Sequence, residues 1–160
     1  MSAHNLGRKL ESTVRAVFLG NEVAEILAEG YGSDAGQNIY TGAASGEKVS
    51  PCVIIHSGSS QEEPPLSGIY DVDLSVMVKA AVNPPDGQSG EQLTASSALV
   101  EAVFNAMNSE NFVDDANAVA VADFSILGRH VATTSASFDE DEWVETIEMR
   151  VACCPFNAAG

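Results

Sequence analysis

The sequence predicts an α+β fold in which an antiparallel, twisted sheet of four or five strands carries two main helices on one face. Three observations support this prediction. Apolar residues recur every three or four positions in two segments, apolar and polar residues alternate in two others, and short links join neighbouring predicted strands. Because 45% of the 160 residues are apolar, the chain can bury one sizeable core, and we expect a single domain over residues 1–160.

The first predicted helix is amphipathic. Its apolar stripe comprises Leu6, Leu10, Val14, Val17 and Phe18. Arg8, Lys9, Glu11 and Arg15 fall off this stripe, so the helix presents a locally basic face on an acidic protein. That face is either a solvated outer surface or a docking surface for an acidic neighbour.

Residues 22–32, "EVAEILAEGYG", either extend this helix or form a second short one, and Gly30 and Gly32 stop either. The next segment, residues 33–48, is rich in Gly, Ser, Ala and Asn, and we expect a long connection with a short strand at residues 38–40. The run "GAASGEKVS" in this segment lacks the spacing of a phosphate-binding loop, because only three residues separate Gly42 from Gly46.

Two strands are predicted before the second helix. The run "KVSPCVIIHS" is a short strand opened by Pro51, and the polar run "SGSSQEEPPLSG" after it is a loop. In the next strand, Val72, Leu74, Val76 and Val78 alternate with Asp71, Asp73, Ser75 and Lys79. A period of two buries one face of this strand and leaves the other face polar.

A second helix follows the turn "NPPDGQSGEQ", in which Ser89 and Gln92 have the spacing of a capping box. We expect its core stripe to comprise Leu93, Ser96 or Ser97, Val100, Phe104 and Met107. Beyond it, "VAVADFSILG" and "RHVATTSASF" are predicted strands, "DEDEW" is a turn or loop, and "VETIEMRVACC" is the last strand. One face of the predicted sheet carries Asp71, Asp73, Glu148 and Arg150; it faces water in an isolated domain and can line the lumen of a ring.

The charge of the chain excludes several classes of partner. Seven Lys and Arg stand against 23 Asp and Glu, and the formal charge of −16 repels phosphate backbones and anionic lipid. Neither a signal peptide nor a run of roughly 20 apolar residues is present, so we expect a soluble protein that is cytoplasmic when made.

No residue pattern indicates catalysis, a cofactor or a metal. Three cysteines without C-x-x-C spacing are expected to be reduced and buried in strands, and the histidines are scattered. The "DEDE" run lacks the spacing of a calcium-binding hand, and no G-x-S-x-G elbow accompanies the serines near His56. The pair Asp71 and Asp73, roughly 7 Å apart on one strand face, lacks the aromatic platforms of a sugar-binding site. A small enzyme that uses Cys52 and His56 remains a weaker alternative.

Four segments together resemble a known family. The runs "SPCVIIHSGS", "GIYDVDLSVMVKAAV", "GEQLTASSALVEAVFNAM" and "WVETIEMRVACC", in this order, resemble the tail terminator and tail-completion proteins of long-tailed phages. Leu6–Phe18 matches the first helix of that family, Pro51–Ile55 the first core strand, and Leu93–Met107 the second helix. Residues 33–46 and 61–68 depart from the compact family pattern, and we expect them to be flexible in the free subunit.

The resemblance implies a structural virion protein of the tail or neck, assembled in the host cytoplasm. Its members form a homo-hexameric ring that ends polymerisation of the tail tube protein and joins the tail to head–tail adaptor proteins, with DNA passing through the lumen without specific binding. A head–tail adaptor bound to the portal is the alternative function. The candidate ring or partner contacts are Arg8, Lys9, Arg15, Glu62, Glu63, Asp71, Asp73, Asp139 and Glu140.

Overall fold

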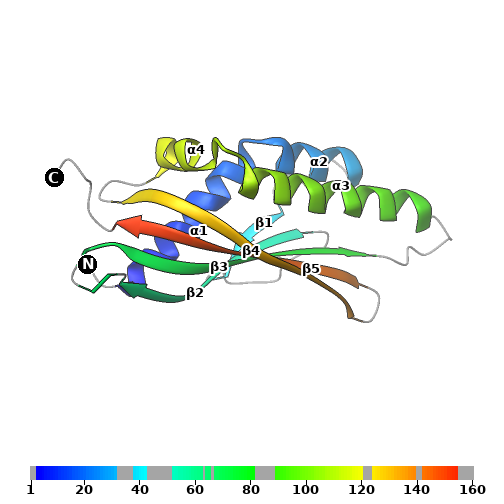
Figure 1. Cartoon of the computed structure of the whole chain (residues 1–160). Coiled ribbons are helices and arrows are strands. Elements are labelled where there is room, and N and C mark those ends of the chain that lie inside the picture. Colours follow the sequence, from blue (N-terminus) through cyan, green and yellow to red (C-terminus); the bar gives the residue numbers. More distant parts are fainter. Residues whose placement is uncertain are drawn as a thin grey trace.

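Four helices lie on one face of a five-stranded sheet (Figure 1). The computed structural model describes residues 3–31, 38–42, 52–62, 64–65, 67–81, 89–120, 124–139 and 142–154. The helices are α1 (Ala3–Leu19), α2 (Glu22–Tyr31), α3 (Ser89–Asn108) and α4 (Phe112–Val119). The strands are β1 (Ile39–Thr41), β2 (Cys52–Glu62), β3 (Tyr70–Ala81), β4 (Ser125–Asp139) and β5 (Glu142–Cys154). The predicted α+β class is confirmed, with four helices instead of two main ones.

The sheet is mixed, which corrects the expectation of a purely antiparallel sheet. Its strand order is β1-β2-β3-β5-β4, and β1 pairs with β2 in parallel. The Val53 N–H donates to the Asn38 carbonyl and the Gly42 N–H to the Ile55 carbonyl, at 2.9 and 2.7 Å. The sequence of β1 could not indicate whether it pairs in parallel or antiparallel. This orientation depends on the partner strand and not on the periodicity of a three-residue strand.

Strand β2 is longer than the sequence indicated. Residues 57–62 were expected to begin a loop, but they continue the strand after a register shift between Ser57 and Ser60. The shift places one extra β2 residue opposite β3, and such an irregularity accommodates a polar stretch that shows no regular alternation. The expected mobility of residues 33–46 and 61–68 concerns segments that lie partly outside the described residues, and it stays a prediction that amide exchange can test.

Helix α1 packs on β1 and β2 through the predicted stripe, whose five side chains are all buried. Glu11, expected off this stripe, is buried as well, with 4% of its surface exposed. Its carboxylate accepts hydrogen bonds from Gly42 and Ser57. A buried carboxylate requires such donors, and they come from segments distant in sequence that no helical periodicity reveals.

The buried face of α3 is rotated from the expected stripe. Leu99, Val103 and Met107 are fully buried, whereas Val100 and Phe104 are only half-buried. Helix α3 packs against α2 as well as against the sheet, so two neighbours determine which face is covered. The predicted capping box and the expected core positions 93, 96 and 97 have side chains outside the described part of the helix.

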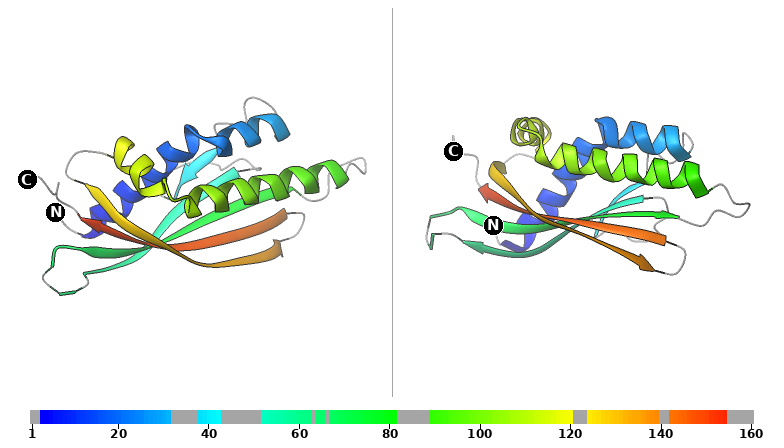
Figure 2. Two further views of the ribbon diagram at one scale, coloured as in Figure 1. Left: turned by 45° about the horizontal axis from the view of Figure 1, so that its top comes forward. Right: turned by 45° about the vertical axis from the view of Figure 1, so that its right-hand side comes forward.

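Strand β4 alone stands where two strands were predicted between residues 119 and 138, and helix α4, which the sequence analysis did not predict, precedes it. β4 is one long strand with register shifts between Ile126 and Gly128 and between Val131 and Thr133. Figure 2 shows β4 and β5 twisting together across the sheet below α3 and α4. Asn117 holds α4 against β4, because its amide donates to the Ile126 carbonyl and accepts from the Ile126 N–H, both at 2.8 Å.

The core lies between the helices and the sheet. The predicted alternation in β3 is confirmed, because Val72, Leu74, Val76 and Val78 are at most 1% exposed. In β5, Ile147, Met149 and Val151 face the same core. Among the described residues, no helix is long and apolar enough to cross a membrane.

Candidate functional site: the open face of the sheet

The face of the sheet opposite the helices carries a polar surface, which we call the open face. It comprises Ser59 on β2, Asp73 and Ser75 on β3, Glu148 and Arg150 on β5, and His130 on β4. The strand register aligns Asp73 with Arg150 and Arg150 with His130, while Ser75 lies opposite Glu148. One row across the strands joins Asp73, Arg150 and His130, and the next row joins Ser75 and Glu148. The two rows lie on the same face, because side chains two apart on a strand point to the same side of the sheet.

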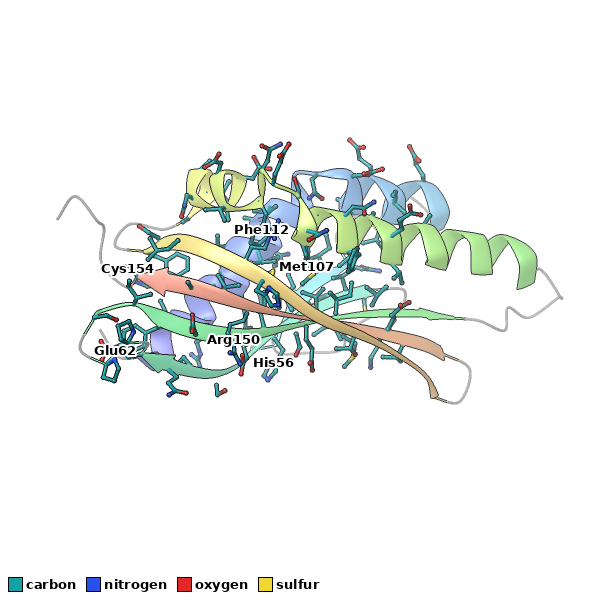
Figure 3. All side chains as sticks on the ribbon, viewed as in Figure 1. His56, Glu62, Met107, Phe112, Arg150 and Cys154 are labelled. Atoms are coloured by element: carbon teal, nitrogen blue, oxygen red, sulfur yellow. The ribbon has the colours of Figure 1, made fainter. Side chains whose placement is uncertain are left out.

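An ion pair occupies the centre of the open face. The Arg150 Nε lies 3.2 Å from the Asp73 Oδ1, and the Ser59 hydroxyl donates to the Asp73 Oδ2 at 2.9 Å. The Arg150 and Asp73 side chains are 62% and 50% exposed. Exposed pairs contribute about 0–1 kcal/mol to stability, so this pair orients charge on the surface more than it stabilises the fold. Figure 3 shows Arg150 on the side of the sheet away from the helices that carry Met107 and Phe112.

A shallow hollow of about 370 Å³ lies over this ion pair. It is lined by Asp73, Leu74, Ser75, His130, Glu148, Met149 and Arg150. The lining mixes both signs of charge, and no group of three or more His, Cys, Asp or Glu side chains in the described residues is arranged to hold a metal ion. The arrangement is a mixed-charge surface in which the Ser59 hydroxyl is hydrogen-bonded to the Asp73 carboxylate beside the ion pair.

The predicted contact residues that the structure describes lie on α1, at the end of β2, on β3 and at the end of β4. On α1, Arg8 is exposed, Lys9 is half-buried, and the Arg15 Nε donates to the Ile39 carbonyl at 2.6 Å. Glu62 ends β2, and its Oε2 accepts from the Gly68 N–H at 2.9 Å.

Asp71 and Asp73 are both half-buried on β3, and only Asp73 belongs to the ion pair. Asp139 ends β4 with a side chain outside the described part, and Glu63 and Glu140 lie outside the described residues altogether. The open face and the basic part of α1 are therefore two distinct surfaces.

Ser59 and His130 were not among the predicted contact residues. Ser59 lies in a segment expected to be a loop, and His130 lies in a strand whose partner the sequence does not identify. The signal that could have found them is the register of the sheet, which only the pairing of distant strands establishes.

The cysteines occupy strand positions, as predicted. Cys52 and Cys153 are buried and Cys154 is half-buried, and all three are free thiols. Burial, and then the charges of Asp71 and Cys154, raise the pKa of Cys153 from 9.0 to about 12, which leaves the thiol protonated. Cys52 is buried while His56 is exposed four residues further along β2, roughly 13 Å away by strand geometry. This separation removes the contact that a Cys–His catalytic pair needs.

Comparison with known proteins shows a similarity of structure. No protein-family model and no curated protein matches the sequence. Among solved structures, the chain is similar to a component of the "Virion of native gene transfer agent (GTA) particle", with a TM-score of 0.53 and 16% sequence identity. The similarity covers 89% of this chain and 92% of that chain, so the two share a fold over nearly their whole length.

Proposed function

We propose that this protein is a structural component of a phage-like virion and, within it, a tail terminator. The observation that carries the proposal is the similarity of fold, over nearly the full length of both chains, to a component of a gene transfer agent virion. The order of segments that resembles tail terminators supports the finer assignment. A fold alone does not determine function, so the site must also suit the role.

The open face suits a structural role. It is polar and carries a mixed set of charges, and no group of three or more His, Cys, Asp or Glu among the described residues is arranged to hold a metal ion. In a ring of six copies this face can line the lumen. Six subunits would bring together six times the formal charge of −16. The negative potential of such a ring repels DNA that passes through its lumen.

The proposed partners follow from this role. One surface of the ring contacts the last ring of tail tube protein and stops its growth, and the other contacts the head–tail adaptor. The end of the β2–β3 hairpin, where Glu62 pairs with Tyr70, extends beyond the helices and is available for one of these contacts (Figure 2).

Length control of the tail tube tests the proposal. Purified tube protein of the same particle is polymerised with and without this protein, and tube lengths are measured by negative-stain electron microscopy. We expect the protein to shorten the tubes and to cap one end. A Val76→Asp variant, whose fold we expect to be lost, is the inactive control.

Two results would contradict the terminator assignment. Tubes of unchanged length, without protein at either end, would exclude a terminator under these conditions of assembly. Binding to the portal ring together with unchanged tube length would instead assign the protein to the adaptor class.

A further inference from the structure

The helical layer, formed by α1, α2, α3 and α4, has its three Lys and Arg residues, Arg8, Lys9 and Arg15, on α1. Helices α2, α3 and α4 contain no Lys or Arg. Their exposed carboxylates include Glu22, Glu25, Glu29, Glu101, Asp114 and Asp115. Two copies that approach each other through these helices therefore repel.

The exception is the cationic corner, formed by Arg8 and Lys9 on α1. Neither side chain has an ion pair or hydrogen bond in the described part of the chain. Arg15, Arg129 and Arg150, by contrast, are engaged with the Ile39 carbonyl, the end of α3 and Asp73. Arg8, Ser12 and Ala16 are exposed at intervals of four on α1, so a small-residue surface runs from the corner along the helix.

We propose that the cationic corner docks onto the acidic stripe of α2, formed by Glu22, Glu25 and Glu29, in a second copy of this chain. This inference rests on the proposed ring-forming function and names the surface that builds the ring. The three glutamates are exposed at spacings of three and four residues, which places them on one face of α2.

The position of the stripe on its helix favours α2 over α4 as the partner surface. Asp114 and Asp115 lie in the first turn of α4, as Glu22 and Glu25 lie in the first turn of α2. The positive end of each helix dipole already stabilises these carboxylates, so Glu29 makes the difference. Glu29 lies near the negative end of α2, and no basic residue occupies the last turn of that helix. A cationic side chain of a neighbouring subunit is stabilised more strongly beside Glu29, because it interacts both with the carboxylate and with the negative end of the helix dipole.

The geometry favours a head-to-tail contact. Figures 1 and 2 show α1 crossing beside the sheet toward α2, and α2 continuing away from it along α3. Lys9 and Glu22 lie at most about 20 Å apart along the helix axes. A contact between different surfaces of two copies is heterologous, and repeated heterologous contacts form a ring when the rotation from one copy to the next closes, as the proposed ring requires. Ser12 and Ala16 allow the neighbouring helix to approach closely.

A pair of variants matched in charge tests the contact. Arg8→Gln/Lys9→Gln removes two positive charges, and Asn105→Asp/Asn111→Asp adds two negative charges at exposed positions elsewhere in the helical layer. Sedimentation velocity over a range of concentrations measures assembly of the full chain. We expect the first variant to raise the concentration needed for assembly at least about tenfold, and the second to change it little. Equal effects of the two variants would overturn the specific contact, and so would a wild-type chain that stays monomeric.

A mixing experiment tests the pairing of the two surfaces. Arg8→Glu/Lys9→Glu and Glu25→Lys/Glu29→Lys each place like charges at every interface, so each protein alone is expected to remain small. In a mixture, every interface of an alternating ring again joins opposite charges, and we expect assembly to the wild-type size. Failure of the mixture to assemble, with both proteins folded by circular dichroism, would overturn the proposal. A mixed species no larger than a dimer would overturn its head-to-tail form.

The tube-length experiment separates this inference from the proposed function. If wild-type protein shortens tubes while Arg8→Gln/Lys9→Gln assembles like wild type, the docking surface is wrong and the function stands. If assembly depends on the two surfaces as described but tubes grow unchecked, the docking surface is right and the terminator assignment is wrong.

Discussion

The carboxylate of Glu11 on α1 accepts two hydrogen bonds from Ser57 on β2, one from its backbone N–H at 3.0 Å and one from its hydroxyl. The other carboxylate oxygen accepts from the Gly42 N–H, just after β1, at 3.0 Å. One turn earlier on α1, a side chain at Gly7 would overlap the Ser57 hydroxyl. The helix therefore lies close against β2, and one buried acid joins it to two strands.

Replacing Glu11 should destabilise the fold. In Glu11→Ala, the Ser57 N–H and hydroxyl lose their acceptor inside the protein, while the Gly42 N–H keeps the Ile55 carbonyl. We expect the free energy of unfolding to fall by about 1–3 kcal/mol, measured by urea denaturation. Glu25→Ala on the exposed face of α2 is the control and should change it by less than about 0.5 kcal/mol. Equal effects of the two variants would show that the Glu11 contacts contribute nothing specific.

The two faces of β3 should respond differently to charge. Val76 is fully buried against the helices, so Val76→Asp places an unpaired carboxylate in the core. We expect a loss of about 4 kcal/mol or more, enough to unfold many domains of this size. Ser75→Lys, on the open face opposite Glu148, should fold normally by circular dichroism. A folded Val76→Asp protein would mean that the buried face of β3 is assigned wrongly.

The Cys153 thiol should make stability depend on pH in the alkaline range. Burial, reinforced by Asp71 and Cys154, raises the pKa of Cys153 from 9.0 to about 12 in the folded protein. Between these values the unfolded chain loses the proton and the folded protein keeps it, so the free energy of unfolding falls as the pH rises. From about pH 8 to about pH 10.5, we expect this group to remove on the order of 2 kcal/mol. Urea denaturation of wild type and Cys153→Ala isolates the effect, and parallel pH profiles would contradict it.

Asn117 should protect the free edge of β4. Its amide satisfies both backbone groups of Ile126, as a neighbouring strand would. Asn117→Ala should cost about 1–2 kcal/mol and expose an unpaired strand edge, which promotes association between chains. Urea denaturation measures the loss of stability and light scattering measures the association. Asn105→Ala, at an exposed position of α3, is the control. An unchanged tendency to aggregate would show that α4 covers this edge without the amide.

Local periodicity determined the parts of the fold that one element defines by itself. The stripe of α1 and the alternation in β3 and β5 follow from side-chain geometry within a helix or strand, so the apolar side chains named for these elements were correctly predicted to be buried. The charge asymmetry of the chain and the absence of catalytic motifs were also evident from the sequence.

The tertiary structure decided every feature that depends on partners distant in sequence. Asp73 and Arg150 meet only because β3 pairs with β5 in one particular register, and Glu11 is buried only because Gly42 and Ser57 supply its donors. The parallel direction of β1 and the rotation of α3 likewise depend on neighbouring elements. The energies of strand pairing and helix packing depend on all the elements together. A single strand edge or helix face can pair with several partners, and its native partner is selected only when the whole core forms.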